Sequence, residues 1–263
     1  MPIHQTARTF GARRVPTVAA ASGCWQLGEV TQARRDGIWP LGTVLKTDLV
    51  AWYDAGQGVF DATSGGSAVT DGNAVARWED QSGSGFHLTQ ATAAAQPTLN
   101  NSTLNGLPVL TFASGDVIST ASSVVTGSIS RVIFAVCSGS TGSSNVVASL
   151  GNQSGSGTLY AVTGEIAVRV ANGSRGFGTS LSATHVSLTV TETTGNVSGA
   201  EVRVNGSSVA ASSTSAQTLN TQSGLEVGSS LGGDIAELLI YDAALSTAER
   251  DSIEDYLTTK YGL

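Results

Sequence analysis

The chain has 263 residues, a formal net charge of −7 at neutral pH and only 13% charged residues. Apolar residues make up 40% of it and fall into strand-length blocks, which argues against a disordered body because disordered chains lack apolar surface to bury. No apolar run approaches the roughly 18 residues of a membrane-spanning helix. The length favours one large all-β domain over two small ones.

Residues 1–46 differ from the rest of the chain in charge. They contain six of the 13 basic residues and two of the 20 acidic ones, so this arm carries about +4 and the remaining body about −11. Charge alone leaves three partners open for the arm: its own or a neighbouring body, a separate acidic partner, or nucleic acid. Nucleic acid is the least favoured, because the basic residues are dispersed and the body would repel phosphates.

Residues 1–22 do not match a secretory signal. Such a signal needs a continuous apolar stretch of at least about seven residues, and Arg8, Arg13 and Arg14 interrupt the sequence here. We therefore expect a soluble protein that is made in a cytoplasm.

Residues 23–40 (GCWQLGEVTQARRDGIWP) are the organised part of the arm. The stretch 29–35 suits two helical turns, and Gly37 suits their end. The pattern W-x-L-x-E-x-x-x-A-R-R-x-G-x-W-P resembles an element of structural proteins of tailed bacteriophages, where it occurs beside tail-fibre, head-fibre or capsid-decoration modules. The resemblance implies attachment to a virion. The attachment residues would be Trp25, Leu27, Val30, Arg34, Arg35 and Trp39.

A second interpretation of the arm needs no virion. An N-terminal clasp that covers a sheet edge or the open end of the body would hide unpaired strand groups. The two interpretations are compatible, since a clasp can also carry an attachment surface.

The body alternates short β-branched runs with segments rich in Gly, Ser and Thr. These runs alternate apolar and polar residues as half-buried antiparallel strands do. Examples are residues 131–137 (RVIFAVC), 165–170 (EIAVRV), 185–190 (HVSLTV) and 200–204 (AEVRV). Asn172-Gly173 and Asn205-Gly206 follow two of the runs and are typical of hairpin turns. Together these features predict several short antiparallel strands.

Residues 231–263 predict a closing strand followed by a capped helix. Residues 235–241 are apolar, and Ser246 then lies three residues before Glu249, which is the spacing of a capping box. Gly262 suits the end of the helix. Apolar residues recur on one helical side and charged residues take the other. The apolar side comprises Ile253, Tyr256 and Leu257, and the charged side comprises Arg250, Glu254 and Asp255.

This ending resembles the terminal segment of concanavalin A-like jelly rolls of the laminin-G-like (LamG) type, in which a GxIxExxIYxxxLS pattern leads into a short helix. Three upstream segments, residues 49–54 (LVAWYD), 75–88 (VARWEDQSGSGFHL) and 105–112 (NGLPVLTF), resemble strands and a turn of the same group. The resemblance spans residues 47–263. It implies an all-β, two-sheet antiparallel β-sandwich with an N-terminal arm over 1–46, a short C-terminal helix and a frequent role in lectin-like carbohydrate binding.

Glycan sites on such folds combine aromatic rings with polar side chains, and sometimes a calcium ion. The residues of this kind are Trp52, Asp54, Asp61, Asp71, Trp78, Asp80, Asn172 and Arg175. Several have an ordinary alternative: the two Trp residues suit a core, Asp80 suits a turn cap, and Asn172 suits a hairpin. No D-x-D spacing favours a calcium loop and no Cys/His cluster favours zinc, so calcium rests on the resemblance and no other cofactor is expected.

Catalysis is disfavoured by the arrangement of carboxylates. Glucanases on a concanavalin A-like fold resemble one another in a strand-borne E-x-D-x-E run, whose carboxylates share one sheet face. This chain has no such run. Its closest carboxylates along a strand, Asp234 and Glu237, are three residues apart and are expected on opposite faces. His4, His87 and His185 have no cysteine or nucleophile-elbow serine nearby, so each is expected to be structural or exposed.

These observations predict a non-enzymatic structural protein of a tailed-phage particle. The arm would bind capsid or tail proteins, and the body would be displayed on the virion surface, where it can touch host glycans without membrane insertion. A homotrimer is expected by analogy with display proteins. The alternatives are a stand-alone carbohydrate-binding module and a divergent glycoside hydrolase.

Overall fold

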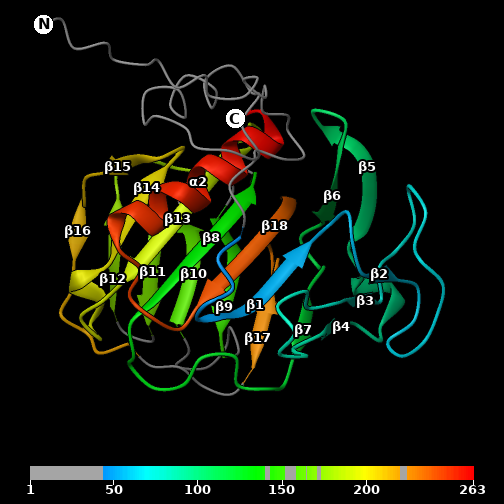
Figure 1. Cartoon of the computed structure of the whole chain (residues 1–263), viewed down its shortest axis with the longest axis horizontal. Coiled ribbons are helices and arrows are strands. Elements are labelled where there is room, and N and C mark those ends of the chain that lie inside the picture. Colours follow the sequence, from blue (N-terminus) through cyan, green and yellow to red (C-terminus); the bar gives the residue numbers. More distant parts are fainter. Residues whose placement is uncertain (1–43, 140–142, 152–157, 164, 171–172, 220–223) are drawn as a thin grey trace, which may run out of the picture. The chain divides into compact units, whose positions relative to one another are not determined.

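The computed structural model describes residues 44–139, 143–151, 158–163, 165–170, 173–219 and 224–263. In this part of the chain, strands form two antiparallel sheets and one α-helix crosses one of the sheets (Figure 1). The chain divides into the units Met1–Thr43 and Val44–Leu263, and the described residues all belong to the second unit. The predicted all-β architecture with a short C-terminal helix is therefore confirmed.

The sheet crossed by the helix, called the front sheet below, has the strand order β15-β14-β13-β8-β18-β6-β5, with β1 also paired to β18. Its strands are β1 (Leu49–Asp54), β5 (Thr98–Leu104), β6 (Leu107–Phe112), β8 (Arg131–Cys137), β13 (Val186–Glu192), β14 (Glu201–Val204), β15 (Ser207–Val209) and β18 (Gly233–Tyr241). The strands expected at 49–54 and 131–137 have the predicted bounds.

The other sheet, called the back sheet below, has the strand order β16-β12-β11-β10-β9-β17-β7-β4-β3-β2. Its strands are β2 (Val59–Phe60), β3 (Arg77–Trp78), β4 (Leu88–Thr89), β7 (Ile118–Thr120), β9 (Ser143–Leu150), β10 (Thr158–Thr163), β11 (Ile166–Val170), β12 (Gly173–Phe177), β16 (Ser213–Thr214) and β17 (Leu225–Val227). Two 3-10 turns, η1 (Ala93–Ala95) and η2 (Val197–Gly199), complete the described elements.

The hydrophobic core lies between the two sheets, because alternate residues of each strand point inward. In β8, Ile133, Ala135 and Cys137 belong to this core. The intervening residues are buried too, and Phe134 packs edge-on against Tyr241 with ring centroids 5.8 Å apart on the outer side of the front sheet. The front sheet is therefore buried on both faces along β8.

Helix α2 (Thr247–Tyr261) covers that outer side (Figure 1). The predicted capping box is present: the Ser246 hydroxyl accepts from the Glu249 amide at 3.3 Å, and the Glu249 carboxylate accepts from the Ser246 amide at 2.8 Å. Gly262 ends the helix in the left-handed region with φ 66°. Among the described residues, no helix is long and apolar enough to cross a membrane.

The expected charged side of α2 needs one correction. Glu254 is buried rather than exposed, although Ile253, Tyr256 and Leu257 are buried as predicted. The Glu254 carboxylate accepts from the Thr189 hydroxyl at 2.6 Å and forms an ion pair with Arg203 at 3.0 Å. A carboxylate can face a sheet when the sheet offers a hydroxyl and a guanidinium, and these partners come from β13 and β14.

Candidate functional site

The predicted ligand-binding residues do not converge on one place. Trp78 is fully buried in the core, and its indole N–H donates to the Asp54 carbonyl at 2.9 Å. Asp80 caps a turn, as its carboxylate accepts from the amides of Trp52, Ser82 and Phe86 at 2.8–3.1 Å. These two residues are therefore occupied by structural contacts.

Three further predicted residues lie apart from these two. Asp61 accepts from the Ser67 amide at 2.8 Å within its own loop, and Asp71 accepts from the Asn101 amide at 2.7 Å. Arg175 of β12 donates to the Ser198 carbonyl of η2. Asn172 and the attachment residues lie outside the described residues. Those attachment residues are Trp25, Leu27, Val30, Arg34, Arg35 and Trp39.

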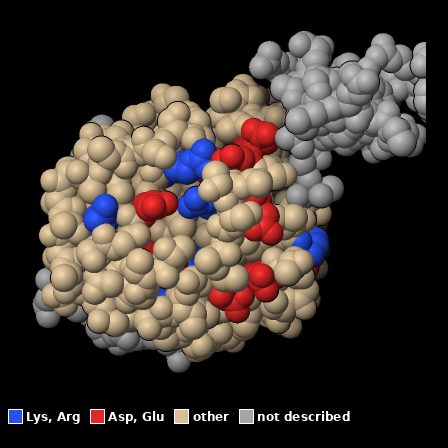
Figure 2. Space-filling model, turned by 60° about the vertical axis from the view of Figure 1, so that its left-hand side comes forward, with Lys and Arg blue, Asp and Glu red and all other residues tan. Residues whose placement is uncertain are grey.

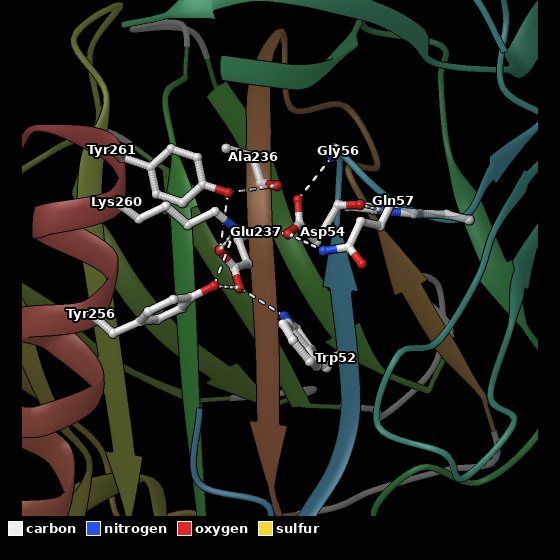
Figure 3. Close-up of polar contacts among 10 residues, drawn as sticks. Trp52, Asp54, Gly56, Gln57, Ala236, Glu237, Tyr256, Lys260 and Tyr261 are labelled. Atoms are coloured by element: carbon white, nitrogen blue, oxygen red, sulfur yellow. Dashed lines mark hydrogen bonds and ion pairs between the residues drawn. The ribbon is translucent and has the colours of Figure 1, made fainter. Parts of the chain in front are cut away.

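Trp52 and Asp54 do belong to a common cluster, called the Lys260 cluster below, between β1, β18 and α2 (Figure 3). Its other members are Glu237 of β18 and Tyr256, Lys260 and Tyr261 of α2. The Lys260 ammonium lies 2.7 Å from the Asp54 carboxylate and 2.8 Å from the Glu237 carboxylate. One cation therefore bridges two buried carboxylates.

Glu237 is the centre of the cluster and is fully buried. Besides the Lys260 ammonium, its carboxylate accepts from the Trp52 indole at 2.7 Å and from the hydroxyls of Tyr256 and Tyr261 at 3.0 Å each. Figure 3 shows these donors pointing at the carboxylate from both β1 and α2. These four donors give the Glu237 carboxylate the hydrogen bonds that a buried charge needs in place of water.

Burial sets the acid–base properties of the Lys260 cluster. Burial raises the pKa of Glu237, and the neighbouring Lys260 ammonium partly opposes that rise. Burial by itself would lower the pKa of Lys260, but the carboxylates of Glu237 and Asp54 raise it above its ordinary value. The pKa of Tyr261 is also raised, first by burial and then by Glu237. Lys260 therefore stays charged at neutral pH and the phenol stays protonated.

Sequence reasoning placed Asp234 and Glu237 on opposite faces of the strand, and this prediction is wrong. The register of β18 against β8 shifts between Ile235 and Glu237, which marks a β-bulge. Ile235 and Leu238 both face the core, so their strand neighbours Asp234 and Glu237 both lie on the outer side. The single carboxylate within the apolar run 235–241 was the signal that a buried partner exists.

Asp234 anchors a smaller polar cluster on the same side of the front sheet. Its carboxylate accepts from the Thr111 hydroxyl at 2.6 Å and lies 3.0 Å from the His185 ring nitrogen. Burial alone would raise the pKa of Asp234, but the bonds from His185 and Thr111 bring it below its ordinary value. The expectation that His185 is structural agrees with this position.

Neither cluster has the composition of a metal site. Among the residues that the structure describes, no group of three or more His, Cys, Asp and Glu side chains could hold a metal ion. Calcium therefore stays a prediction of the resemblance without candidate ligands in this part of the chain.

Most basic side chains of the described residues are paired with carboxylates. Ion pairs with N to O distances of 2.7–3.4 Å are formed by Arg77, Arg131, Arg203, Arg250 and Lys260. Figure 2 shows the same pattern on one face, where basic and acidic residues lie close together and large areas carry no charge. Little positive charge is left to attract an acidic ligand.

The fold is shared with carbohydrate-active proteins of known structure. No family model and no curated protein sequence matches the chain. A Trypanosoma rangeli sialidase matches with a TM-score of 0.54 and 12% identity, over 86% of this chain and 35% of that chain. A GH54 α-L-arabinofuranosidase with a cyclic sulfate inhibitor matches with a TM-score of 0.57 and 15% identity, over 81% and 63%.

Another solved structure gives the same picture. An arabinofuranosidase complexed with arabinofuranosyl-alpha-1,2-xylobiose matches with a TM-score of 0.52 and 17% identity, over 72% of this chain and 51% of that chain. The chain thus spans about a third to just under two thirds of the length of these structures. At such identities the likeness concerns the fold.

These matches contradict the prediction that the protein is not an enzyme. The sialidase and the arabinofuranosidases are glycoside hydrolases. The prediction relied on the absence of an E-x-D-x-E run, and that run marks only one arrangement of carboxylates on this kind of fold. Its absence therefore does not exclude glycoside hydrolysis.

Proposed function

We propose that the protein is a carbohydrate-binding β-sandwich of the concanavalin A-like, laminin-G-like type, carried on the particle of a tailed bacteriophage by its N-terminal arm. The observation that carries the carbohydrate part is the fold shared with the sialidase and the arabinofuranosidases. Antiparallel sandwiches of this kind present broad sheet faces and rim loops, which suit extended ligands such as glycans.

The jelly-roll part of the proposal is supported by the sequence patterns and by the elements that their residues form in the structure. The closing strand and capped helix of the resemblance become β18 and α2. The Trp-Glu-Asp-Gln-Ser-Gly turn is built around Asp80, whose carboxylate accepts three backbone amides. The carboxylate of the closing pattern is Glu237, the centre of the Lys260 cluster.

The virion part of the proposal rests on residues 23–40. There the arm would bind capsid or tail proteins through Trp25, Trp39 and the pair Arg34-Arg35, and the body would be displayed at the virion surface. A homotrimer would present three copies of the body. The basic arm and the acidic body favour different partners. This difference supports separate roles, with attachment by the arm and glycan binding by the body.

A binding assay tests the carbohydrate part. The full chain is titrated by calorimetry with arabinoxylo-oligosaccharides and sialyllactose, and the same mixtures are analysed for released sugars. Saturable binding to either sugar is the expected result, and absence of binding to both contradicts the proposal. Release of sugar would establish the second candidate function, glycoside hydrolysis, which the matches to glycoside hydrolases favour.

Light scattering after size exclusion tests the arm. The full chain is compared with the double variant Trp25→Ala/Trp39→Ala, and Ile129→Ala, which truncates an exposed apolar side chain of the body, serves as the control. We expect a defined oligomer that the arm variant loses and the control keeps. A full chain that is monomeric contradicts assembly through the arm.

A further inference from the structure

The outer side of the back sheet carries a continuous row of five side chains, four of which are polar. Strand pairing places five residues directly opposite one another across β2, β3, β4, β7 and β17: Phe60, Arg77, Thr89, Ser119 and Glu226. At a spacing of about 4.8 Å between strands, the row is about 19 Å long. We call it the outer row.

The direction of these side chains follows from strand alternation. Their neighbours Val59, Trp78, Leu88, Ile118 and Leu225 all belong to the hydrophobic core. Because successive residues of a strand point to opposite faces, the outer row points away from the core. Each of its five residues is partly exposed.

This exposure distinguishes the back sheet from the front sheet. On the front sheet, α2 covers the outer side and buries even the charged residues Glu237 and Glu254. On the back sheet, the outer row keeps access to solvent across five adjacent strands. The polar groups of the outer row are spread over about 19 Å, which suits an extended ligand better than a small compact one.

One end of the outer row is pre-ordered. The Arg77 guanidinium lies over the Phe60 ring at 4.3 Å and its Nη2 atom is 3.1 Å from the Glu79 carboxylate. Its Nε atom is buried and has no hydrogen-bond partner among the described residues. The side chain is thus held in place by one ring and one carboxylate, which reduces the entropy lost when a ligand binds.

We infer that the outer row is a binding site for a neutral glycan chain. The inference rests on the proposed function and names its site and ligand class. The row offers the Arg77 guanidinium as a donor and the hydroxyls of Thr89 and Ser119, each of which can donate and accept, as the hydroxyls of a sugar do. The Phe60 ring adds apolar surface at one end of the row.

The charge of the site selects a neutral ligand. Within the row, the positive charge of Arg77 is already paired with the Glu79 carboxylate. The body as a whole is strongly acidic, and most of its basic side chains are paired. A sialylated or uronic-acid chain would meet net repulsion, whereas the hydroxyls of a neutral chain would not.

The test compares variants of the row with a matched variant elsewhere. Ser119→Arg places a long side chain in the middle of the row, and Thr89→Val removes one hydroxyl at nearly constant shape. Ser207→Arg introduces the same side chain on β15, an exposed strand of the other sheet. Each full-length variant is titrated by calorimetry with arabinoxylo-oligosaccharide and with sialyllactose, and its melting temperature is recorded.

We expect Ser119→Arg to weaken binding of the neutral oligosaccharide by about tenfold or more, equivalent to about 1.4 kcal/mol. Thr89→Val should weaken it several-fold, and Ser207→Arg should leave it unchanged. Neutral-sugar binding that survives both row variants overturns the site while leaving the proposed function intact. Preference for sialyllactose overturns the ligand class, and a full chain that binds neither sugar overturns the proposed function itself.

Discussion

Two buried charge clusters in this protein differ in how completely their charged groups are hydrogen-bonded. In the Lys260 cluster, four donors satisfy Glu237 on the outer side of the front sheet. In the second cluster, Glu192 of β13 lies 3.4 Å from the Arg131 guanidinium and accepts from the Tyr160 hydroxyl of β10 at 2.7 Å. There, Arg131 Nη1 and Glu192 Oε1 are buried without a partner among the described residues.

The difference reflects what each cluster connects. The Lys260 cluster joins α2 to β1 and β18, so the flexible Lys and Tyr side chains of a helix can reach the carboxylates from several directions. The Glu192 cluster joins the two sheets from within the core, where fixed strand positions leave fewer directions of approach. A buried pair that is fully hydrogen-bonded is costly to break, and one that is partly satisfied contributes less.

The largest expected effect is at Lys260. Lys260→Met would leave the carboxylates of Asp54 and Glu237 buried without their shared cation, and loss of one partner of a buried pair costs about 3–5 kcal/mol. Urea unfolding at neutral pH would measure the loss. Arg169→Met is the control, because Arg169 is an exposed residue of β11 in the back sheet. Equal stability of the two variants would show that the cluster does not hold α2.

A smaller loss of stability is expected at the Glu192 cluster when both Arg131 and Glu192 are replaced. Arg131→Met alone should destabilise the protein, because Glu192 is left buried without a cation. The double variant Arg131→Met/Glu192→Leu should recover part of that loss, since apolar residues of similar volume often replace a buried pair at little cost. Denaturant unfolding of single and double variants gives the comparison. A double variant less stable than the single one would contradict the distinction drawn between the clusters.

Removal of the helix cap should cost less stability than disruption of the Lys260 cluster. Ser246→Ala removes the acceptor of the Glu249 amide, and loss of such a cap costs about 1 kcal/mol. The contribution is local and independent of the Lys260 cluster. Thermal unfolding of Ser246→Ala and Ser246→Thr separates the loss of the acceptor from the change in size, and the Thr variant should retain most of the stability.

The smallest expected effect is a pH dependence at Asp234. The folded-state pKa of this carboxyl is lowered, so its stabilising contribution is present above the unfolded pKa of about 3.9 and is lost as pH falls through the folded value. The stability difference between the protein and Asp234→Asn, below about 1 kcal/mol at this partly exposed site, should therefore shrink in acid. A difference that grows in acid would contradict the assigned shift.

Local sequence signals predicted the elements that depend on neighbouring residues. The capping box at Ser246 and Glu249 and the left-handed Gly262 were readable, because their partners lie within four residues. The Asn205-Gly206 turn adopts positive φ at both residues between β14 and β15, as its type requires. Asp80 caps its turn within six residues of the amides that it accepts from Ser82 and Phe86.

The candidate sites escaped sequence reasoning because their members are far apart in the chain. Lys260 and Asp54 are separated by 206 residues, and no local pattern relates them. The bulge before Glu237 added one residue to the strand and reversed the face expected from simple alternation. The outer row depends on the pairing order of five strands, which is a property of the whole sheet.

The sequence by itself determined that this protein is built from short strands, closes with a capped amphipathic helix and separates a basic arm from an acidic body. Period-two alternation, turn residues and caps act over a few residues, so they can be read locally. The tertiary structure alone decided which carboxylates are buried under α2, which polar side chains align on the back sheet, and which cations are already paired. Those outcomes depend on strand order and register, which are fixed only when distant segments pack together.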